Sequence, residues 1–168
     1  MVKKIVLFAL LLIPVMGYAQ EQKIAYFKSS DVIPVMPEYK QMLDSLKSSE
    51  AALQAELQSM ADEYTKKMTA FSEQQATLSE SIKALRMKEI ESLRDRTEGF
   101  QQQAQQIQSD LQQSLFAPIE AKVRKALTEV GTENHYAYIL NADMNVVLFI
   151  SPQSPDVTPA VKAKLGLK

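Results

Sequence analysis

The sequence predicts a mostly α-helical chain in which a long antiparallel helical hairpin projects from a small body of short β-strands. Two observations carry this prediction. The 168 residues include only 4 glycines, and no glycine or proline occurs between Glu38 and Gly99. Within that stretch apolar residues recur with the seven-residue period of a coiled-coil seam. Residues before and after the hairpin contain the β-type runs, so they are expected to form the body.

The N-terminal 19 residues have the pattern of a secretory signal peptide. Lys3 and Lys4 precede an apolar run over residues 5–16, and small residues follow at Gly17 and Ala19. The alternative, a membrane anchor, is disfavoured because a spanning helix needs roughly 20 apolar residues. We expect cleavage after Ala19 and export of the mature chain. Loss of the two lysines then changes the formal net charge from -1 to -3.

The hairpin arm is predicted to span residues 37–118, and its two helices carry separate apolar registers. The outgoing helix has a first register, broken only at Glu50, and a second register three residues later. These are Leu43, Leu57, Tyr64, Phe71 and Leu78, followed by Leu46, Leu53 and Met60. The returning helix repeats the alternation with Ile90, Leu93, Thr97, Phe100, Ala104, Ile107 and Leu111. Lys67 and Gln74 fall on core positions near the turn, so the seam is expected to weaken there.

The turn of the hairpin is predicted near residues 76–81. Thr77 and Glu80 fit the capping box that begins many helices, and they mark the start of the returning helix. The alternative is one uninterrupted helix over residues 38–134, which would be about 140 Å long at 1.5 Å per residue. Pro118 lies inside the returning helix and is expected to bend it, because proline removes one backbone hydrogen bond.

Residues 20–36 and 119–168 are expected to form the body. Its first strand is the short β-type run Lys23–Phe27. Two more runs, residues 136–141 and 146–150, are separated by four residues and are predicted to pair as a β-hairpin.

A short helix is expected to close the chain. Thr158 is its predicted N-cap, Pro159 occupies the first helical position, and Gly166 stands just past the end. Each of these residue types is typical of its position in a helix.

The body has too little apolar material to be stable as a single copy. Three strands of about five residues make a marginal sheet on their own. We therefore expect several copies to pool their strands, while the arms project. The residues expected to build this oligomeric body are Ile24, Tyr26, Tyr138, Ile139, Leu140, Val147, Leu148 and Phe149. These arguments leave dimer, trimer and tetramer open.

Five segments resemble the Skp/OmpH family of periplasmic chaperones. Lys23–Phe27 is similar to the family's first strand, and Met36–Lys40 to the Pro-Glu-Tyr start of its first arm. Tyr138–Ala142 together with Val147–Phe149 resembles its final strand pair, and Asp156–Val161 resembles its closing helix.

The resemblance implies a homotrimer with a small β-body and three helical arms around a cavity. It implies that the protein holds unfolded outer-membrane β-barrel proteins in the periplasm without ATP. The best-known family members are strongly basic, whereas the mature chain here is mildly acidic, so no lipopolysaccharide site is carried over. His135 stands where many relatives have a helix-ending glycine.

The residues predict no enzyme, cofactor or metal site. The chain has no Cys and a single His, His135, with no nucleophile beside it in the sequence. It has no glycine-rich phosphate loop and no calcium-loop pattern. Nucleic-acid binding is disfavoured because the chain lacks an excess of basic residues.

Five basic residues cluster just after the turn of the hairpin: Lys83, Arg86, Lys88, Arg94 and Arg96. One interpretation is weak contact with a lipid surface or with a client. Acidic residues alternate with them along the helix, which favours a solvated face crossed by ion pairs.

Apolar side chains of the arm are candidates for contact with a client. The set is Met60, Tyr64, Met68, Phe71 and Met87. The first four follow a helical stripe, which more often indicates the seam between two helices. Met68 and Met87, together with Met42, lie beside the strict seam, where flexible methionine side chains suit many apolar partners.

Two functions of different class follow from this pattern. One is a holding chaperone that makes many weak apolar contacts with a mobile client. The other is a static periplasmic coiled-coil adapter that joins envelope proteins. The polar core positions Lys67 and Gln74 favour flexible arms and hence the chaperone, because a rigid adapter would need an uninterrupted apolar seam.

Overall fold

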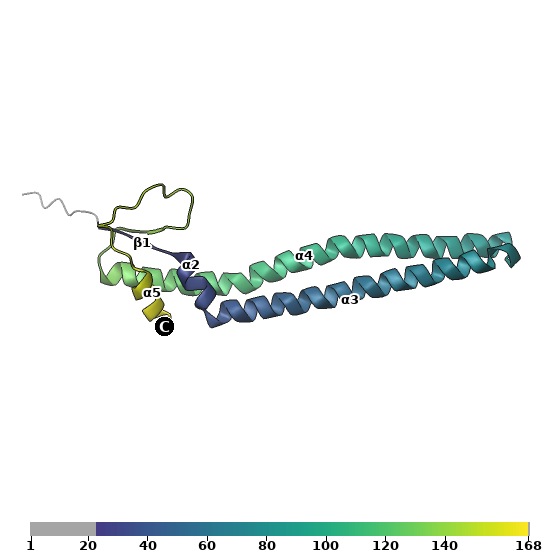
Figure 1. Ribbon diagram of the computed structural model, residues 1–168, viewed down its shortest axis with the longest axis horizontal. Helices are drawn as coiled ribbons and strands as arrows, with labels where there is room; N and C mark the ends of the chain where they lie inside the picture. Colours follow the sequence, from purple (N-terminus) through teal and green to yellow (C-terminus); the bar gives the residue numbers. More distant parts are fainter. Residues whose placement is uncertain (1–22, 168) are drawn as a thin grey trace, which may run out of the picture.

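The computed structural model describes residues 23–167. The predicted signal peptide and its cleavage after Ala19 lie outside the described residues. Two long helices lie side by side and a small body sits at one end of them (Figure 1). This arrangement confirms the predicted fold class. The elements are β1 (Ile24–Phe27), α2 (Ser29–Val32), the 3-10 helix η2 (Ile33–Val35), α3 (Pro37–Gln74), the 3-10 helix η3 (Gln75–Thr77), α4 (Glu80–Glu133), β2 (Tyr138–Asn141) and α5 (Thr158–Lys164).

The hairpin turns where it was predicted, but the capping residue is different. Helix α3 ends at Gln74 and α4 begins at Glu80, with Ser79 as its N-cap. The Thr77 hydroxyl donates to the Gln74 carbonyl oxygen at 2.9 Å, so it closes η3 and does not cap α4. The predicted capping box is therefore wrong, because the 3-10 turn directs Thr77 back towards α3.

Helix α4 continues through Pro118 as a single helix of 54 residues. Proline leaves the carbonyl of the preceding turn without its usual donor, which a helix tolerates by bending. Figure 1 shows α4 changing direction beside the start of α3. Glu38, at the start of α3, forms an ion pair with Lys122, which lies one turn beyond Pro118 in α4.

The core of the body lies on one face of the C-terminal part of α4. Its residues there, spaced four, three and four apart, are Ile119, Val123, Ala126 and Val130. Against them pack residues from β1, α2, the start of α3 and the C-terminal segment. These are Ala25, Phe27, Val32, Met36, Met42, Val157 and Val161. Apolar burial of this kind is the main stabilising contribution to the body.

The sheet within the described residues has two strands, and they run parallel. The register pairs Ile24 with Tyr138 and Phe27 with Asn141. On the other edge of β1, the Tyr26 amide donates to the Pro155 carbonyl at 3.0 Å. The sheet therefore joins the N-terminal strand to two segments that lie more than a hundred residues further along the chain.

The predicted β-hairpin of residues 136–141 with 146–150 does not form. Residues 147–150 have no assigned secondary structure, and Val146, Leu148 and Phe149 are 79%, 93% and 80% exposed. An extended segment becomes a strand only when a partner accepts its backbone hydrogen bonds. Within the described chain β2 pairs with β1 on one edge and its other edge stays open, so residues 146–150 have β-type composition but no strand partner there.

The last helix differs from its prediction by one position at its start. The Thr158 amide donates to Asp156 Oδ1 at 2.9 Å, and the Thr158 hydroxyl accepts from the Lys28 amide at 3.0 Å. Thr158 is therefore the first helical residue and holds α5 to the end of β1. Gly166 confirms the predicted end, with φ of 68° in the left-handed region.

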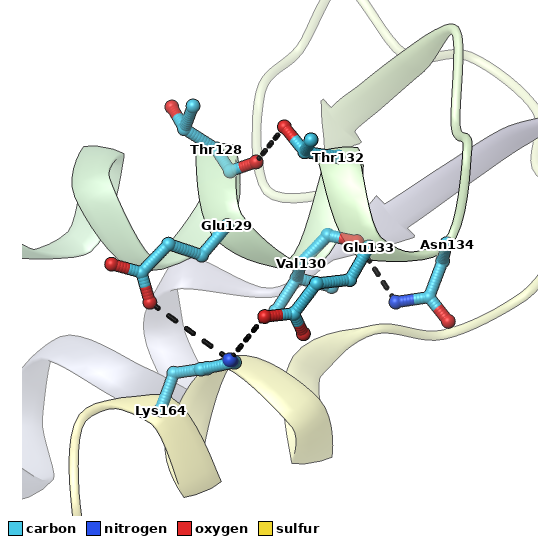
Figure 2. Close-up of polar contacts among 7 residues, drawn as sticks. All are labelled: Thr128, Glu129, Val130, Thr132, Glu133, Asn134 and Lys164. Atoms are coloured by element: carbon cyan, nitrogen blue, oxygen red, sulfur yellow. Dashed lines mark hydrogen bonds and ion pairs between the residues drawn. The ribbon is translucent and has the colours of Figure 1, made fainter.

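Helix α5 is held against the end of α4 by apolar contacts and by ion pairs, and Figure 2 shows the ion pairs. Val161 and Val130 are fully buried between them. Lys164 lies 2.5 Å from Glu133 and 4.0 Å from Glu129. The hydrogen bond with Glu133 raises the pKa of Lys164, because the carboxylate favours the charged ammonium group.

His135 ends helix α4 in a conformation that suits glycine. Its φ is 56°, and it is the one non-glycine residue of the described chain with a positive φ. The His135 amide donates to Thr132 O at 3.3 Å and the Tyr136 amide to Gly131 O at 3.0 Å. These are the two hydrogen bonds of a Schellman motif, in which the left-handed residue is usually glycine because a Cβ is unfavourable there.

Replacing His135 by glycine is expected to stabilise the protein by about 0.5–1 kcal/mol, since relief of the left-handed strain exceeds the added flexibility of the unfolded chain. Urea denaturation followed by circular dichroism measures the change. His135→Ala is the matched control, because alanine keeps the Cβ and should not stabilise. An equal gain in both variants would mean that the imidazole, and not the backbone, carries the strain.

Candidate functional site

The arm buries its apolar seam most completely in its middle. Met60, Ile90, Leu93 and Ala104 are each less than 10% exposed. Most of the other predicted seam positions are half-buried, which confirms the two registers. Leu43 and Ile107, near the body, are exceptions at 47% and 38% exposed.

Towards the turn, polar contacts replace apolar ones in the seam. Lys67 lies 3.6 Å from Glu89, and Arg86 donates to Gln74 Oε1 at 2.8 Å. Exposed contacts of this kind contribute little free energy, typically about 0–1 kcal/mol each. The outer end of the arm is therefore held less firmly than its middle.

The predicted client-contact residues differ in how much surface they offer. Met68 is 41% exposed, whereas Tyr64, Phe71 and Met87 are half-buried. Met60 is only 9% exposed and belongs to the seam, so it has little surface for a client. Met42, which was expected beside the seam, is 5% exposed in the core of the body.

Two exposed apolar residues near the turn were missed by the sequence reasoning. Ile82 and Leu85 are 41% and 54% exposed. These two apolar residues are three positions apart and do not fall on the seam register that contains Ile90. This pattern in the sequence could have identified them as exposed. By heptad position, Met68 and Met87 share one flank of the antiparallel arm, while Ile82 lies on the opposite flank.

The cluster of basic residues near the turn is engaged in local contacts. Lys83 lies 2.7 Å from Glu80, and Arg94 lies 3.2 Å from Asp95 and 3.8 Å from Glu98. These pairs agree with the expected solvated face crossed by ion pairs. The exposed apolar side chains of the outer arm are therefore the stronger candidates for contact with a client.

A second candidate surface covers the outward side of the body. Of the predicted oligomer residues, Tyr26, Ile139 and Val147 are half-buried. The others are substantially exposed: Ile24 at 44%, Tyr138 at 59%, Leu140 at 42%, Leu148 at 93% and Phe149 at 80%. Met144 and Val146 extend the same surface at 54% and 79%. Exposed apolar surface on this scale is uncommon in a protein that acts as a monomer.

An open groove of about 750 Å³ runs beside β2, between the strand and the end of α4. Leu127, Gly131 and Ile139 line it, together with Tyr136 and Tyr138. Helix α4 lies close to β2 at Gly131, where an added Cβ would meet Ile139 Cδ1 at 3.4 Å, the near limit of an ordinary contact. The groove therefore exposes apolar side chains next to a strand edge that is unpaired within residues 23–167.

Comparison with known families decides the identity of this architecture. The family described as Outer membrane protein (OmpH-like) matches residues 23–165, which is almost all of the described chain. The chain belongs to the OmpH-like family. No curated protein matches this sequence.

The OmpH-like fold also appears among solved structures. A crystal structure from Caulobacter crescentus CB15, described as a candidate outer membrane chaperone (OmpH-like), superimposes with a TM-score of 0.72. The match covers 84% of this chain and 82% of the other, at 16% sequence identity. At that identity the likeness establishes the shared fold.

Two further findings concern only residues 23–167 of this OmpH-like chain. None of their helices has the length and apolar character needed to cross a bilayer. The same residues contain no group of three His, Cys, Asp or Glu side chains that could hold a metal ion.

The arm of the OmpH-like chain meets its body at a polar contact. Lys122 of α4 donates to a Glu38 carboxylate oxygen at the start of α3. This hydrogen bond holds the pKa of Glu38 below its ordinary value of 4.5. Met42, one turn further along α3, is buried in the body core beside this contact. The ion pair therefore helps to set where α3 leaves the body.

Replacing Glu38 by glutamine should lower the free energy of unfolding at neutral pH by up to about 1 kcal/mol. Because the folded pKa of Glu38 is lowered, its contribution is present above pH 4.5 and is lost as the pH falls through the folded pKa. Unfolding free energy of the variant should therefore fall less steeply with acid than that of the parent. Denaturant titrations from pH 6 to 3 measure this difference.

The matched control is Glu120→Gln, since Glu120 pairs with Arg124 at 2.7 Å within one turn of α4 and does not join α3 to the body. An acid profile of Glu38→Gln that is identical to the parent's would show that the Lys122 contact contributes nothing to folding.

Proposed function

We propose that this OmpH-like chain is a holding chaperone that acts without ATP in the periplasm, as a homo-oligomer, on unfolded outer-membrane β-barrel proteins. The observation that carries the proposal is the separation of two apolar surfaces. One lies on a long projecting arm with a weak outer seam, and the other on the outward side of the body. Such a chain is suited to assembling through its body while its arms stay free.

The body surface supports assembly with further copies of the same chain. Leu148 and Phe149 are almost fully exposed, so a single copy leaves them in water at a cost of about 25 cal/mol per Å². They lie on a chain segment of β-type composition, and β2 has an unpaired edge within the described residues. Pairing between copies would bury Leu148 and Phe149 and would give the open edge of β2 a partner strand. The family resemblance makes a trimer the expected form.

The arm surface supports client holding and not chemistry. Met68, Ile82 and Leu85 present apolar side chains on the surface of the arm, where they are 41%, 41% and 54% exposed. Unfolded barrel strands expose alternating apolar residues and aggregate when unprotected. Many weak contacts hold such a client and allow it to leave without hydrolysis of a nucleotide. The family relation and the absence of a phosphate-loop pattern agree with a role that is not enzymatic.

The alternative of a static adapter requires a rigid arm. Lys67 and Gln74 make exposed polar contacts where a rigid seam would bury apolar residues. This difference favours the chaperone. The assays below also separate the two functions, because an adapter would assemble but would not suppress aggregation.

Light scattering of the mature protein is expected to report about three times the monomer mass. Leu148→Asp should reduce that mass to the monomer while circular dichroism stays unchanged, because Leu148 is 93% exposed in the single chain and an unpaired charge is costly only in an interface. Leu85→Asp, an exposed site on the arm, is the control and should remain assembled. A parent that is monomeric at micromolar concentration would refute the proposed assembly.

Serine at Met68, Phe71 and Met87 together should weaken client binding roughly tenfold, which corresponds to about 1.4 kcal/mol. The trimer should survive, because these residues lie far out on the arm. Binding of an unfolded outer-membrane protein is measured by fluorescence at low and moderate salt. Salt should have little effect, since apolar contacts are not screened and the mature charge is only about -3.

The opposite flank supplies the matched comparison, with serine at Ile82 and Leu85. A larger loss of client binding from this pair than from the triple variant would show that the client contacts that flank. A steep loss of binding with salt, combined with an unaffected triple variant, would instead assign binding to Lys83, Arg86 and Lys88. Failure of the parent to suppress aggregation at all would favour the adapter.

A further inference from the structure

The segment Val146–Ile150 has the composition of a strand, yet it stands away from the adjacent β2. Four residues separate it from β2, which is a suitable length for a hairpin loop. Figure 1 shows the connection between β2 and α5 as a large loop on the far side of β1 from the helices. Something in the structure therefore directs the chain away from the hairpin path.

A polar network lies at the root of this loop. The Asp143 carboxylate accepts from the Ser29 hydroxyl at 2.8 Å, the Ser30 amide at 2.7 Å and the Ser30 hydroxyl at 3.0 Å. Asn141 accepts from the Asp143 amide at 3.1 Å and donates to the Ser29 hydroxyl at 3.0 Å. The backbone hydrogen bond from Ser30 is the largest cause of the lowered pKa of Asp143, because it favours the ionised carboxylate. The network joins the exit of β2 to the start of α2.

The network determines the path of the chain after β2. The Ala142 amide still donates to Phe27 O at 2.8 Å, so the chain continues along β1 past the end of β2. Asp143 is then held at the first turn of α2. Residues 141–144 and 144–147 form two successive turns. The Met144 amide donates to Asn141 O at 3.3 Å, and the Val147 amide donates to Met144 O at 2.9 Å. A hairpin would require residues 142–145 to reverse as one loop beside β2, whereas here the chain is held at α2 by Asp143 and passes through these two turns instead.

We propose that the network of Ser29, Ser30, Asn141 and Asp143 directs Val146–Ile150 outward to pair with a second copy of the chain, and prevents it from folding back on its own β2. Asp143 is a positioning residue in this scheme, because it acts through the segment that follows it. The inference rests on the proposed assembly. It adds the reason why the segment pairs between copies and not within one.

The test is Asp143→Ala in the full mature chain, with the association constant measured by sedimentation. The expected result is association at least about tenfold weaker, with an unchanged helical spectrum. Asp143→Asn should have a smaller effect, because an amide oxygen still accepts from the Ser30 amide. Asp62→Ala is the control, since Asp62 is an exposed arm carboxylate that accepts only from Gln58 one turn away, at 2.7 Å.

A second measurement reports the path of the segment itself. The chain has no native cysteine, so Leu140→Cys with Val147→Cys introduces the sole pair of thiols. These positions would face each other in the within-chain hairpin. Mild oxidation should give little intrachain disulfide in the parent background and much more with Asp143→Ala.

The outcomes separate this inference from the proposed function. Unchanged association of Asp143→Ala, or equal intrachain disulfide in both backgrounds, would overturn the role of the network. A monomeric parent would overturn the proposed assembly, and with it the pairing between copies. The disulfide measurement would then still decide whether Asp143 keeps the segment from its own β2.

Discussion

The whole structure depends on burial of one apolar face of α4. Ile119, Val123, Ala126 and Val130 form a stripe over three turns, and each is at most 5% exposed. Strand β1 and helix α5 pack on this stripe, although they come from opposite ends of the described chain. The backbone hydrogen bonds of Tyr26 with Pro155 and Val157 then fix β1 against the C-terminal segment. Without the stripe, neither the short strands nor the seven-residue α5 would have a surface to bind.

The same helix continues beyond the body, where the physical situation changes. There α3 and α4 have only each other to cover their apolar seam, so most of their surface faces water. Burial is nearly complete in the middle, at Met60 and Leu93, and gives way to polar contacts at Lys67 and Gln74. Stability is expected to decline along the arm, because local opening follows the density of buried apolar contacts. An arm that is firmest in its middle and loose at its outer end would suit the proposed holding of clients of different shape.

The body is incomplete in a way that matches an assembling protein. A two-stranded parallel sheet is unusual as a finished structure, since parallel strands are normally covered and paired on both sides. Here one edge of β1 is closed by Asp156, while β2 borders an open groove lined by both polar and apolar residues. The exposed segment at Leu148 and Phe149 gives the body a further apolar surface. The shape of the single chain thus supports the proposed assembly, in which the Asp143 network keeps the exposed segment away from its own β2.

The sequence alone determined the hairpin arm, its turn and the end of the last helix. These features follow from patterns within a few residues: the seven-residue apolar period, the lack of glycine and proline, and glycine at position 166. The oligomer and client residues were also chosen from local patterns. Their exposure separated Met68, which is open to solvent, from Met60 in the seam and Met42 in the core.

Only the tertiary structure decided which partner each polar or strand-forming group would take. Thr77 was free to cap either helix, and the 3-10 turn assigned it to α3. Residues 146–150 can form a strand next to any open edge, and Asp143 directs them away from the nearest one. His135 adopts a left-handed backbone because the packing of α4 and β2 requires the chain to turn there. Helical periodicity is local, whereas the β1–β2 pairing and the contact of Asp143 with Ser30 join groups more than a hundred residues apart, so a single sequence leaves several equally good choices.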